Sequence, residues 1–219
     1  PVSVSEIIDL LKEMSNAKHR DGMARFGIDN AQALGIPVPQ LRKLANQIKT
    51  NPELSLELWE SPIHECKILA AMIGDPKQVI PEQMDKWVSE FYSWDICDGA
   101  CGSLFDRTPF AVEKALEYSS SEHEFVKRAG FVLMAEMAVH NKKADDYAFI
   151  QFFPIIEREA WDGRNFVKKA VNWALRQIGK RNKALLPMAI DTARRIRQQD
   201  SKAAKWIASN ALAELDKRL

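Results

Sequence analysis

The apolar residues of this chain recur at helical spacing almost from end to end, and no stretch of useful length alternates polar and apolar residues. Clusters of glycine, proline and serine interrupt this periodicity at 35–39, 61–62, 74–76 and 119–121. The pattern predicts an all-α protein of short helices joined by short connections. The predicted helices are Val4–Ser15, Ala17–Phe26, Pro39–Ile48, Pro52–Glu60, Ile63–Ile73, Pro81–Tyr92, Trp94–Phe105, Pro109–Tyr118, Glu122–Asn141, Asp145–Arg158, Gly163–Lys180, Lys183–Arg197 and Ser201–Leu219.

Pairs of short helices in series are typical of αα solenoids of the HEAT or armadillo type. Five predicted helices carry a polar residue at a comparable place, at successive spacings of 31, 30, 41 and 36 residues: Lys67, Asp98, Arg128, Lys169 and Lys205. The second helices of successive repeats line one surface of a solenoid, so these five residues are expected to face one concavity. The expected fold class is an all-α, HEAT-like αα superhelical solenoid that forms a single domain over residues 1–219.

The net charge of +1 hides an imbalance along the chain. Residues 1–160 carry 17 Lys and Arg against 25 Asp and Glu, a net charge of −8, whereas residues 161–219 carry 14 against 5, a net charge of +9. A basic C-terminal part on an otherwise acidic protein is typical of a surface that meets phosphates, although a solvated helical face gives the same pattern.

One predicted helix opens with Trp94-Asp95-Ile96-Cys97-Asp98, after Ser93 as its N-cap and with Asp95 in its first turn. Trp94 and Asp98 are four residues apart and therefore share a face, on which Cys101 and Phe105 are expected to follow. The expected core side consists of Ile96, Cys97, Ala100 and Leu104. A carboxylate beside an indole and away from the core indicates a surface that binds a cationic or stacked group.

The predicted helix Gly163–Lys180 carries a second aromatic and cationic face. Its expected core stripe consists of Val167, Ala170, Val171, Ala174 and Ile178. Lys169, Trp173, Arg176 and Lys180 cluster on roughly the opposite side. Burial of Trp173 under a second helix layer is one interpretation; the other is an indole that contacts a nucleotide, flanked by phosphate-binding cations.

Other chemistry finds little support in the sequence. Phosphate-loop, dinucleotide-binding, zinc-protease and nucleophile-elbow motifs are absent, and the four histidines are scattered. Cys66, Cys97 and Cys101 form no zinc-type pair and are expected to be reduced, mostly buried thiols, so neither a metal nor a cofactor is expected. Pro1–Leu10 does not look like a leader and no apolar stretch is long enough to span a bilayer, so a cytoplasmic protein with no membrane contact is expected.

The order and spacing of several segments resemble the AlkD-type DNA alkylation repair glycosylases, the HEAT-like repeat alkylpurine DNA glycosylases, from about Met23 to Leu219. The segments that carry the resemblance are 34–43 (LGIPVPQLRK), 58–60 (LWE), 63–65 (IHE), 94–98 (WDICD), 126–129 (VKRA) and 166–176 (FVKKAVNWALR).

The resemblance implies that Asp98 is the catalytic carboxylate and that Trp94 and Trp173 contact the deoxyribose of the damaged nucleotide. It also implies that Arg128 and Arg176 contact DNA, while the charge pattern adds Lys169, Lys180, Lys67 and Lys205 as DNA-binding residues. The sequence departs from the family's representative at three positions. The representative has a tyrosine at the position of Phe26 and a glutamine at the position of Pro37. Glu136 falls where a basic residue is expected.

The expected function is that of a monofunctional DNA glycosylase. An N7- or N3-alkylated purine already carries a positive charge and leaves without a general acid, so Asp98, the one acid in the expected concave track, need only stabilise the sugar cation and orient a water. The expected partner is double-stranded DNA with alkylated bases, bound by a monomer. Two alternatives stay open: a non-catalytic DNA-structure binder of the same fold, which some relatives represent, and a helical protein–protein scaffold.

Overall fold

The computed structural model describes residues 2–219, and within this range every regular element is a helix, which confirms the all-α prediction. The α-helices are α1 (Val4–Glu13), α2 (Ala17–Met23), α3 (Val38–Ile48), α4 (Pro52–Trp59), α5 (His64–Ile73), α6 (Pro81–Ser89), α7 (Trp94–Ser103), α8 (Ala111–Tyr118), α9 (Glu124–His140), α10 (Asp146–Ile150), α11 (Phe152–Glu159), α12 (Asn165–Arg181), α13 (Leu185–Arg197) and α14 (Lys202–Leu215). Three short 3₁₀ helices accompany them: η1 (Ala24–Phe26), η2 (Phe105–Arg107) and η3 (Asp216–Arg218). No helix among residues 2–219 is both long and apolar enough to cross a membrane.

Local sequence explains where several helices begin. The side chains of Asn16, Asn51 and Ser201 each accept a hydrogen bond from a backbone N–H of the helix that they precede. The predicted helix Asp145–Arg158 is wrong in one respect, because the structure divides it into α10 and α11 at Gln151. Pro154 gives the reason: it has no N–H to donate to Ile150, and it is tolerated within the first turn of a new helix.

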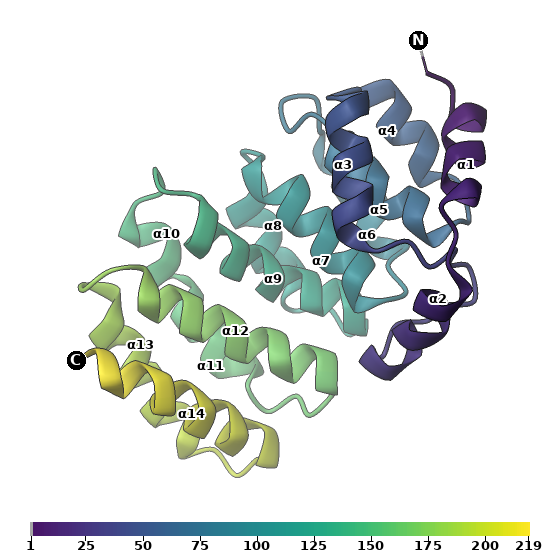
Figure 1. Ribbon diagram of the computed structural model, residues 1–219. Helices are drawn as coiled ribbons and strands as arrows, with labels where there is room; N and C mark the ends of the chain where they lie inside the picture. Colours follow the sequence, from purple (N-terminus) through teal and green to yellow (C-terminus); the bar gives the residue numbers. More distant parts are fainter. Residues whose placement is uncertain (1) are drawn as a thin grey trace. The chain divides into compact units, whose positions relative to one another are not determined.

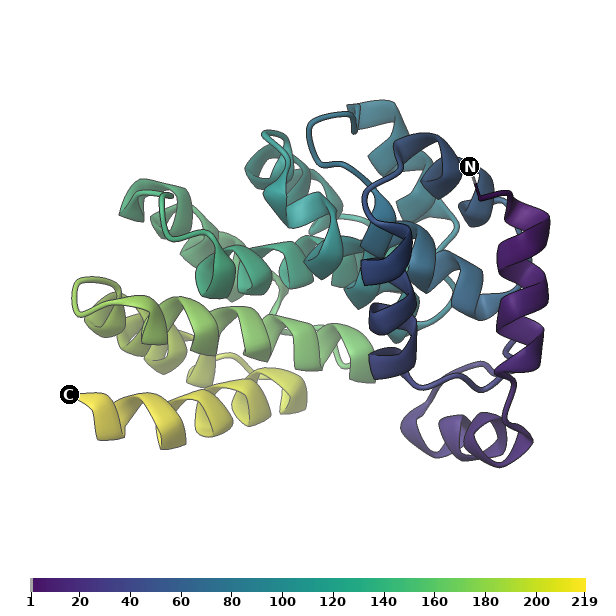
Figure 2. The ribbon, with the colours of Figure 1, turned by 45° about the horizontal axis from the view of Figure 1, so that its top comes forward.

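The helices group into two compact units, of which unit 1 extends to Thr108 and unit 2 begins at Pro109. In unit 1, α5 packs against α3, α4 and α7. In unit 2, α9, α12 and α14 lie side by side in both views (Figures 1 and 2), with α8 packed on α9 and with α13 packed on α11, α12 and α14. Each unit therefore has the helix-on-helix packing expected of HEAT-like repeats.

Four of the five repeated polar residues keep at least part of their side chain exposed, whereas Arg128 is buried. Lys67 lies on α5 and Asp98 on α7 in unit 1, and Arg128, Lys169 and Lys205 lie on α9, α12 and α14 in unit 2. All five helices are the second members of successive helix pairs, in agreement with the repeat pattern. That the five residues face one concavity stays a prediction.

Unit 1 holds its first helices in place through a buried acid. The Glu65 carboxylate of α5 accepts hydrogen bonds from the backbone N–H groups of Leu34, Gly35 and Ile36, at 2.8, 2.9 and 3.2 Å. Gly35 has a φ of +85°, and a Cβ there would lie 2.1 Å from the Asn16 carbonyl oxygen, so only glycine fits. The backbone N–H of Asn16 in turn donates to the Leu34 carbonyl at 2.9 Å, which fixes the start of α2 against this loop.

The three cysteines are free and buried, as expected. Burial raises the pKa of the Cys66 and Cys101 thiols, so both stay protonated at neutral pH. They serve the core rather than a reactive site.

Candidate nucleic-acid interface

Trp94 and Asp98 lie on one side of α7, and both keep part of their surface exposed. Ile96, Cys97 and Ala100 on the other side are buried, in agreement with the predicted core side. Cys101, which α7 places on the side of Trp94, is fully buried, so only the first part of this side is exposed. The expected position of Phe105 on the same side is wrong, and its side chain is also fully buried. Phe105 follows a break in α7 at Leu104, whose φ of −138° is not helical, and its ring packs 5.6 Å from that of Trp87.

A part-buried hydrogen-bond network fixes the first turn of α7. Ser93 is the N-cap residue, but its hydroxyl donates to Asp95 Oδ1 at 2.5 Å, and this same oxygen accepts the N–H of Ile96 at 3.0 Å. The other oxygen of Asp95 lies 2.6 Å from His64 Nε2, and His64 Nδ1 lies 2.7 Å from the Tyr92 hydroxyl. Asp95 therefore joins α7 to α5 as well as sitting at a helix start.

His64 is completely buried, and sequence analysis assigned it no part in the site. Its partners stand 28 and 31 residues further along the chain, so no local motif could have indicated the contact. Burial raises the pKa of the Tyr92 hydroxyl, and the Asp95 carboxylate raises it further, so Tyr92 is a neutral partner of His64 at physiological pH.

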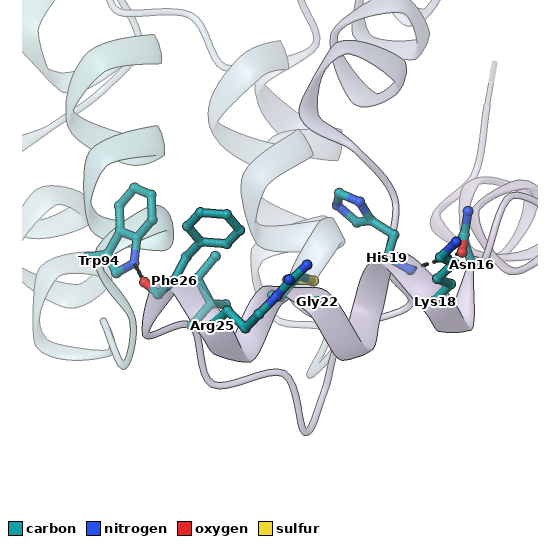
Figure 3. A pocket seen from close by; sticks show the side chains of 9 residues that line it. Asn16, Lys18, His19, Gly22, Arg25, Phe26 and Trp94 are labelled. Carbon is teal, nitrogen blue, oxygen red and sulfur yellow. Dashed lines mark hydrogen bonds between the residues drawn. The ribbon is translucent and has the colours of Figure 1, made fainter.

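Trp94 joins α7 to the segment around η1. Its Nε1 donates to the backbone carbonyl of Phe26 at 2.8 Å (Figure 3). Between these elements lies a hollow of about 540 Å³. The residues that line it are Asn16, Lys18, His19, Gly22, Met23, Arg25, Phe26, Ile28 and Trp94. We call it the Phe26 hollow.

Lys67 has partners inside unit 1. Its Nζ donates to the Trp59 carbonyl at 2.7 Å and lies 4.6 Å from the centre of the Trp59 ring, which stacks on Trp87 at 4.1 Å. Burial lowers the pKa of the Lys67 ammonium group. The structure thus gives Lys67 a packing role that the charge pattern did not indicate, and its contact with DNA stays a prediction.

In unit 2, Arg128 is buried on α9 and contacts the first turn of α12. Its Nη1 donates to the Phe166 carbonyl at 2.6 Å, and its guanidinium carbon lies 6.0 Å from the centre of the Phe166 ring. The guanidinium group therefore fixes the beginning of α12, on which Lys169, Trp173 and Arg176 follow.

The neighbouring Lys127 anchors the segment before α12. Its side chain is 3% exposed, and its Nζ lies 2.7 Å from Glu159 Oε1 and 2.9 Å from Asp162 Oδ2. Arg164 adds a second cation, 2.8 Å from Asp162 Oδ2. We call these four residues the Lys127 cluster. Burial raises the pKa of the Asp162 carboxyl, but hydrogen bonds from Arg164 and Lys127 outweigh burial and leave it well below the ordinary value.

The face of α12 agrees in part with the prediction. Val167, Ala170, Val171, Ala174 and Ile178 are fully buried, which confirms the core stripe. Trp173 is partly exposed and Lys169 is exposed. Lys205, on α14, is also exposed and donates to the Arg197 carbonyl at 3.1 Å.

Arg176 and Lys180 share an acid that sequence analysis missed. Arg176 Nη1 lies 3.4 Å and Lys180 Nζ 2.6 Å from the two oxygens of Glu214, on α14. The hydrogen bond from Lys180 lowers the pKa of the Glu214 carboxyl, so Glu214 is charged at neutral pH. Asp98 is therefore not the only acid among the proposed DNA-binding residues. Arg176 and Glu214 are 38 positions apart in the sequence, so no local pattern indicates this contact.

Comparisons with known proteins bear on the family and the fold of the chain. The sequence model of a protein family described as DNA alkylation repair enzyme matches residues 7–215. A protein of Listeria innocua named "Uncharacterized protein Lin0241" is 26% identical over 111 residues, which are 49% of this chain and 50% of that protein. The chain thus aligns with about half the length of this relative.

A solved structure gives a likeness over nearly the whole chain. Its TM-score is 0.82 at 16% identity, and the match covers 99% of this chain and 95% of the other. That structure is described as one of "a new family of proteins related to the HEAT-like repeat DNA glycosylases with affinity for branched DNA structures". At this identity the likeness establishes a shared HEAT-like fold.

Proposed function

Because the chain belongs to the DNA alkylation repair enzyme family, we propose that it binds double-stranded DNA and hydrolyses the N-glycosidic bond of N7- or N3-alkylated purines, leaving an abasic site. The observation that carries this proposal is the pair Trp94 and Asp98, part-exposed on one side of α7. A buried contact between His64 and Asp95 fixes the helix turn that presents them.

The chemistry suits a carboxylate and an indole. The bond from C1′ to the purine nitrogen breaks, its electron pair neutralises the cationic base, and the sugar becomes oxocarbenium-like. Asp98 stabilises this positive charge and orients a water, whose oxygen bonds to C1′ while its proton passes to the carboxylate or to solvent. The electron-rich face of Trp94 favours a cationic sugar. A base that leaves as a neutral molecule needs no general acid.

Replacement of Asp98 by Asn tests the chemical step, since it keeps the size and one acceptor oxygen of the side chain but removes the charge. Single-turnover release of 7-methylguanine from a duplex should fall about a hundredfold or more, the loss of about 2.7–4 kcal/mol expected for one preorganised electrostatic contact. Asp9→Asn on the exposed surface of α1 is the matched control and should release base at the parent rate. Equal rates in Asp98→Asn and the parent would contradict the assignment.

The two indoles are tested in the same assay. Trp94→Ala should slow base release, because it removes an aromatic face on the same side of α7 as Asp98. Trp173→Ala, in unit 2, is expected to slow release as well, on the family resemblance. Base release at the parent rate in both variants would mean that neither indole contributes to catalysis and that Asp98 acts without them.

DNA binding is proposed to use the cations of unit 2, above all Lys169, Arg176 and Lys180, with Arg128 and Lys205 beside them. The double variant Lys169→Ala/Arg176→Ala should lower duplex affinity and reduce the slope of log K against log salt by roughly one to two units, at about 0.9 per phosphate contact. Lys142→Ala/Lys143→Ala, two exposed cations of the same unit, is the control with an equal change in charge. Loss of affinity in both double variants alike would mean that total charge, not this face, binds DNA.

A second candidate function is binding of branched DNA without base release. The solved structure with the same fold favours this candidate, because it is described as having affinity for branched DNA structures. Retention of DNA affinity by the parent protein, with no release of 7-methylguanine, would decide for this candidate. Absence of salt-dependent DNA binding altogether would decide for a protein–protein scaffold.

A further inference from the structure

We propose that the Phe26 hollow binds one unpaired nucleotide of a DNA strand, with its base on the Phe26 ring and its phosphate among Lys18, His19 and Arg25. The proposal rests on the DNA binding argued above but not on base excision. It names a site that is separate from Asp98 yet belongs to the same unit, since Trp94 contributes to both.

The shape of the hollow suits a planar ligand. Its volume of about 540 Å³ falls within the range of about 300–1,000 Å³ that is typical of small-molecule sites. Figure 3 shows the rings of Trp94, Phe26 and His19 projecting to the same side of α2. Phe26 is 67% exposed, so its ring contributes little to the core and offers an aromatic face to a ligand.

The charge of the hollow suits a phosphate. Lys18 and Arg25 supply positive charge to its lining, and no carboxylate lines it. Within residues 2–219, neither Lys18 nor Arg25 takes part in an ion pair. They differ in this from Arg176 and Lys180, which both pair with Glu214.

An aromatic face beside free cations distinguishes unpaired from paired nucleotides. In a duplex both faces of a base are covered by its neighbours, and a protein reaches only the base edges and the backbone. An unpaired base exposes a face on which an aromatic side chain can stack, and sites for single strands combine such stacking with a positive groove. The hollow therefore favours DNA with a bulged or single-stranded nucleotide over a continuous duplex.

The experiment uses the full chain and two undamaged duplexes of one sequence, one of which carries a single bulged 2-aminopurine. Fluorescence anisotropy gives both dissociation constants, and 2-aminopurine emission reports stacking. The parent should prefer the bulged duplex by about tenfold and quench its emission. Phe26→Ala should abolish the preference and the quenching, because a stacked base contributes about a tenfold or larger gain in affinity. Phe26→Trp should keep both.

The design separates the hollow from folding and from excision. Phe26→Ala keeps the backbone carbonyl that Trp94 contacts, and Tyr147→Ala, at a tyrosine 71% exposed in unit 2, is the control for loss of an exposed ring. Lys18→Ala/Arg25→Ala should lower the salt slope for the bulged duplex only. Equal binding of both duplexes by the parent, or unchanged preference in Phe26→Ala, overturns the proposal. Bulge preference in a parent that releases no base supports the hollow while refuting the glycosylase.

Discussion

Replacement of Glu65 by Ala tests how unit 1 holds α2 in place. Glu65 is 1% exposed, and its carboxylate accepts three backbone N–H groups, of which those of Gly35 and Ile36 are buried. A hydrogen bond to a charged group contributes about 1.5–3 kcal/mol, so loss of the two buried ones should lower the free energy of unfolding by about 3–6 kcal/mol. The third bond, to the part-buried Leu34 N–H, adds less.

The variant Glu65→Gln refines this expectation. Its amide keeps one oxygen that accepts a hydrogen bond but turns an NH₂ donor towards the other N–H groups. We expect a loss of about half that of Glu65→Ala. Glu13→Ala, at an exposed acid of α1, should change the free energy by less than about 0.5 kcal/mol.

Two measurements check the reasoning. Urea unfolding followed by circular dichroism gives the free energies, and amide hydrogen exchange reports residues 34–36 directly. The loop N–H groups should exchange much faster in Glu65→Ala than in the parent, and so should those of α2, which the loop holds through Asn16. An unfolding free energy within about 1 kcal/mol of the parent, with slow exchange at 34–36, would refute the role given to Glu65.

The other predictions concern charge. Unit 2 should lose stability as pH falls below about 4, because the carboxyl pKa values of the Lys127 cluster are lower in the folded chain than in the unfolded chain. The stabilisation by these carboxylates is complete at pH values above the unfolded-state pKa values. It is lost as the pH falls towards the folded-state pKa values. The urea midpoint of unfolding, measured at a series of acidic pH values, checks this prediction. In Asp162→Asn the midpoint should depend less on pH than in the parent. Glu214→Gln should raise duplex affinity about two- to fivefold, the equivalent of up to about 1 kcal/mol for a part-exposed ion pair. Glu157→Gln is the control and should leave duplex affinity unchanged. Equal gains in affinity in the two variants would mean that net charge alone sets the affinity. His64→Ala should lower the free energy of unfolding by about 1.5–3 kcal/mol, because the hydrogen bond to Asp95 is lost. It should also slow base release, because the first turn of α7 is then less firmly held. A release rate equal to that of the parent would mean that the His64 contact does not affect the site.

The sequence predicts the helices well because their signals are local. Asn51 with Pro52, and Ser201, mark helix starts within a few residues, and the apolar stripe of α12 follows from spacing alone. The division at Gln151 was missed because the apolar periodicity continues through it. Phe105 was misplaced because spacing cannot show that α7 ends before it.

The site is predictable only as far as single helices go. Trp94 and Asp98 share a face of one helix, so their spacing was enough to pair them. The contacts of His64, Glu65 and Glu214 join residues about 30 to 40 positions apart, and only the packing of successive repeats brings them together. An isolated buried acid or histidine carries no periodic signal of its own.

The carboxylate shared by Arg176 and Lys180 has a kinetic consequence under the proposed function, in which these cations contact DNA. Each phosphate that approaches these two cations replaces an anion that belongs to the protein, and that anion stays within reach to take the cations back. Formation and rupture of the contact then differ little in free energy, and the contact can pass from one phosphate to the next without release of the whole protein. Under the proposed function, Glu214 would in this way favour rapid one-dimensional movement over tight residence at any one position.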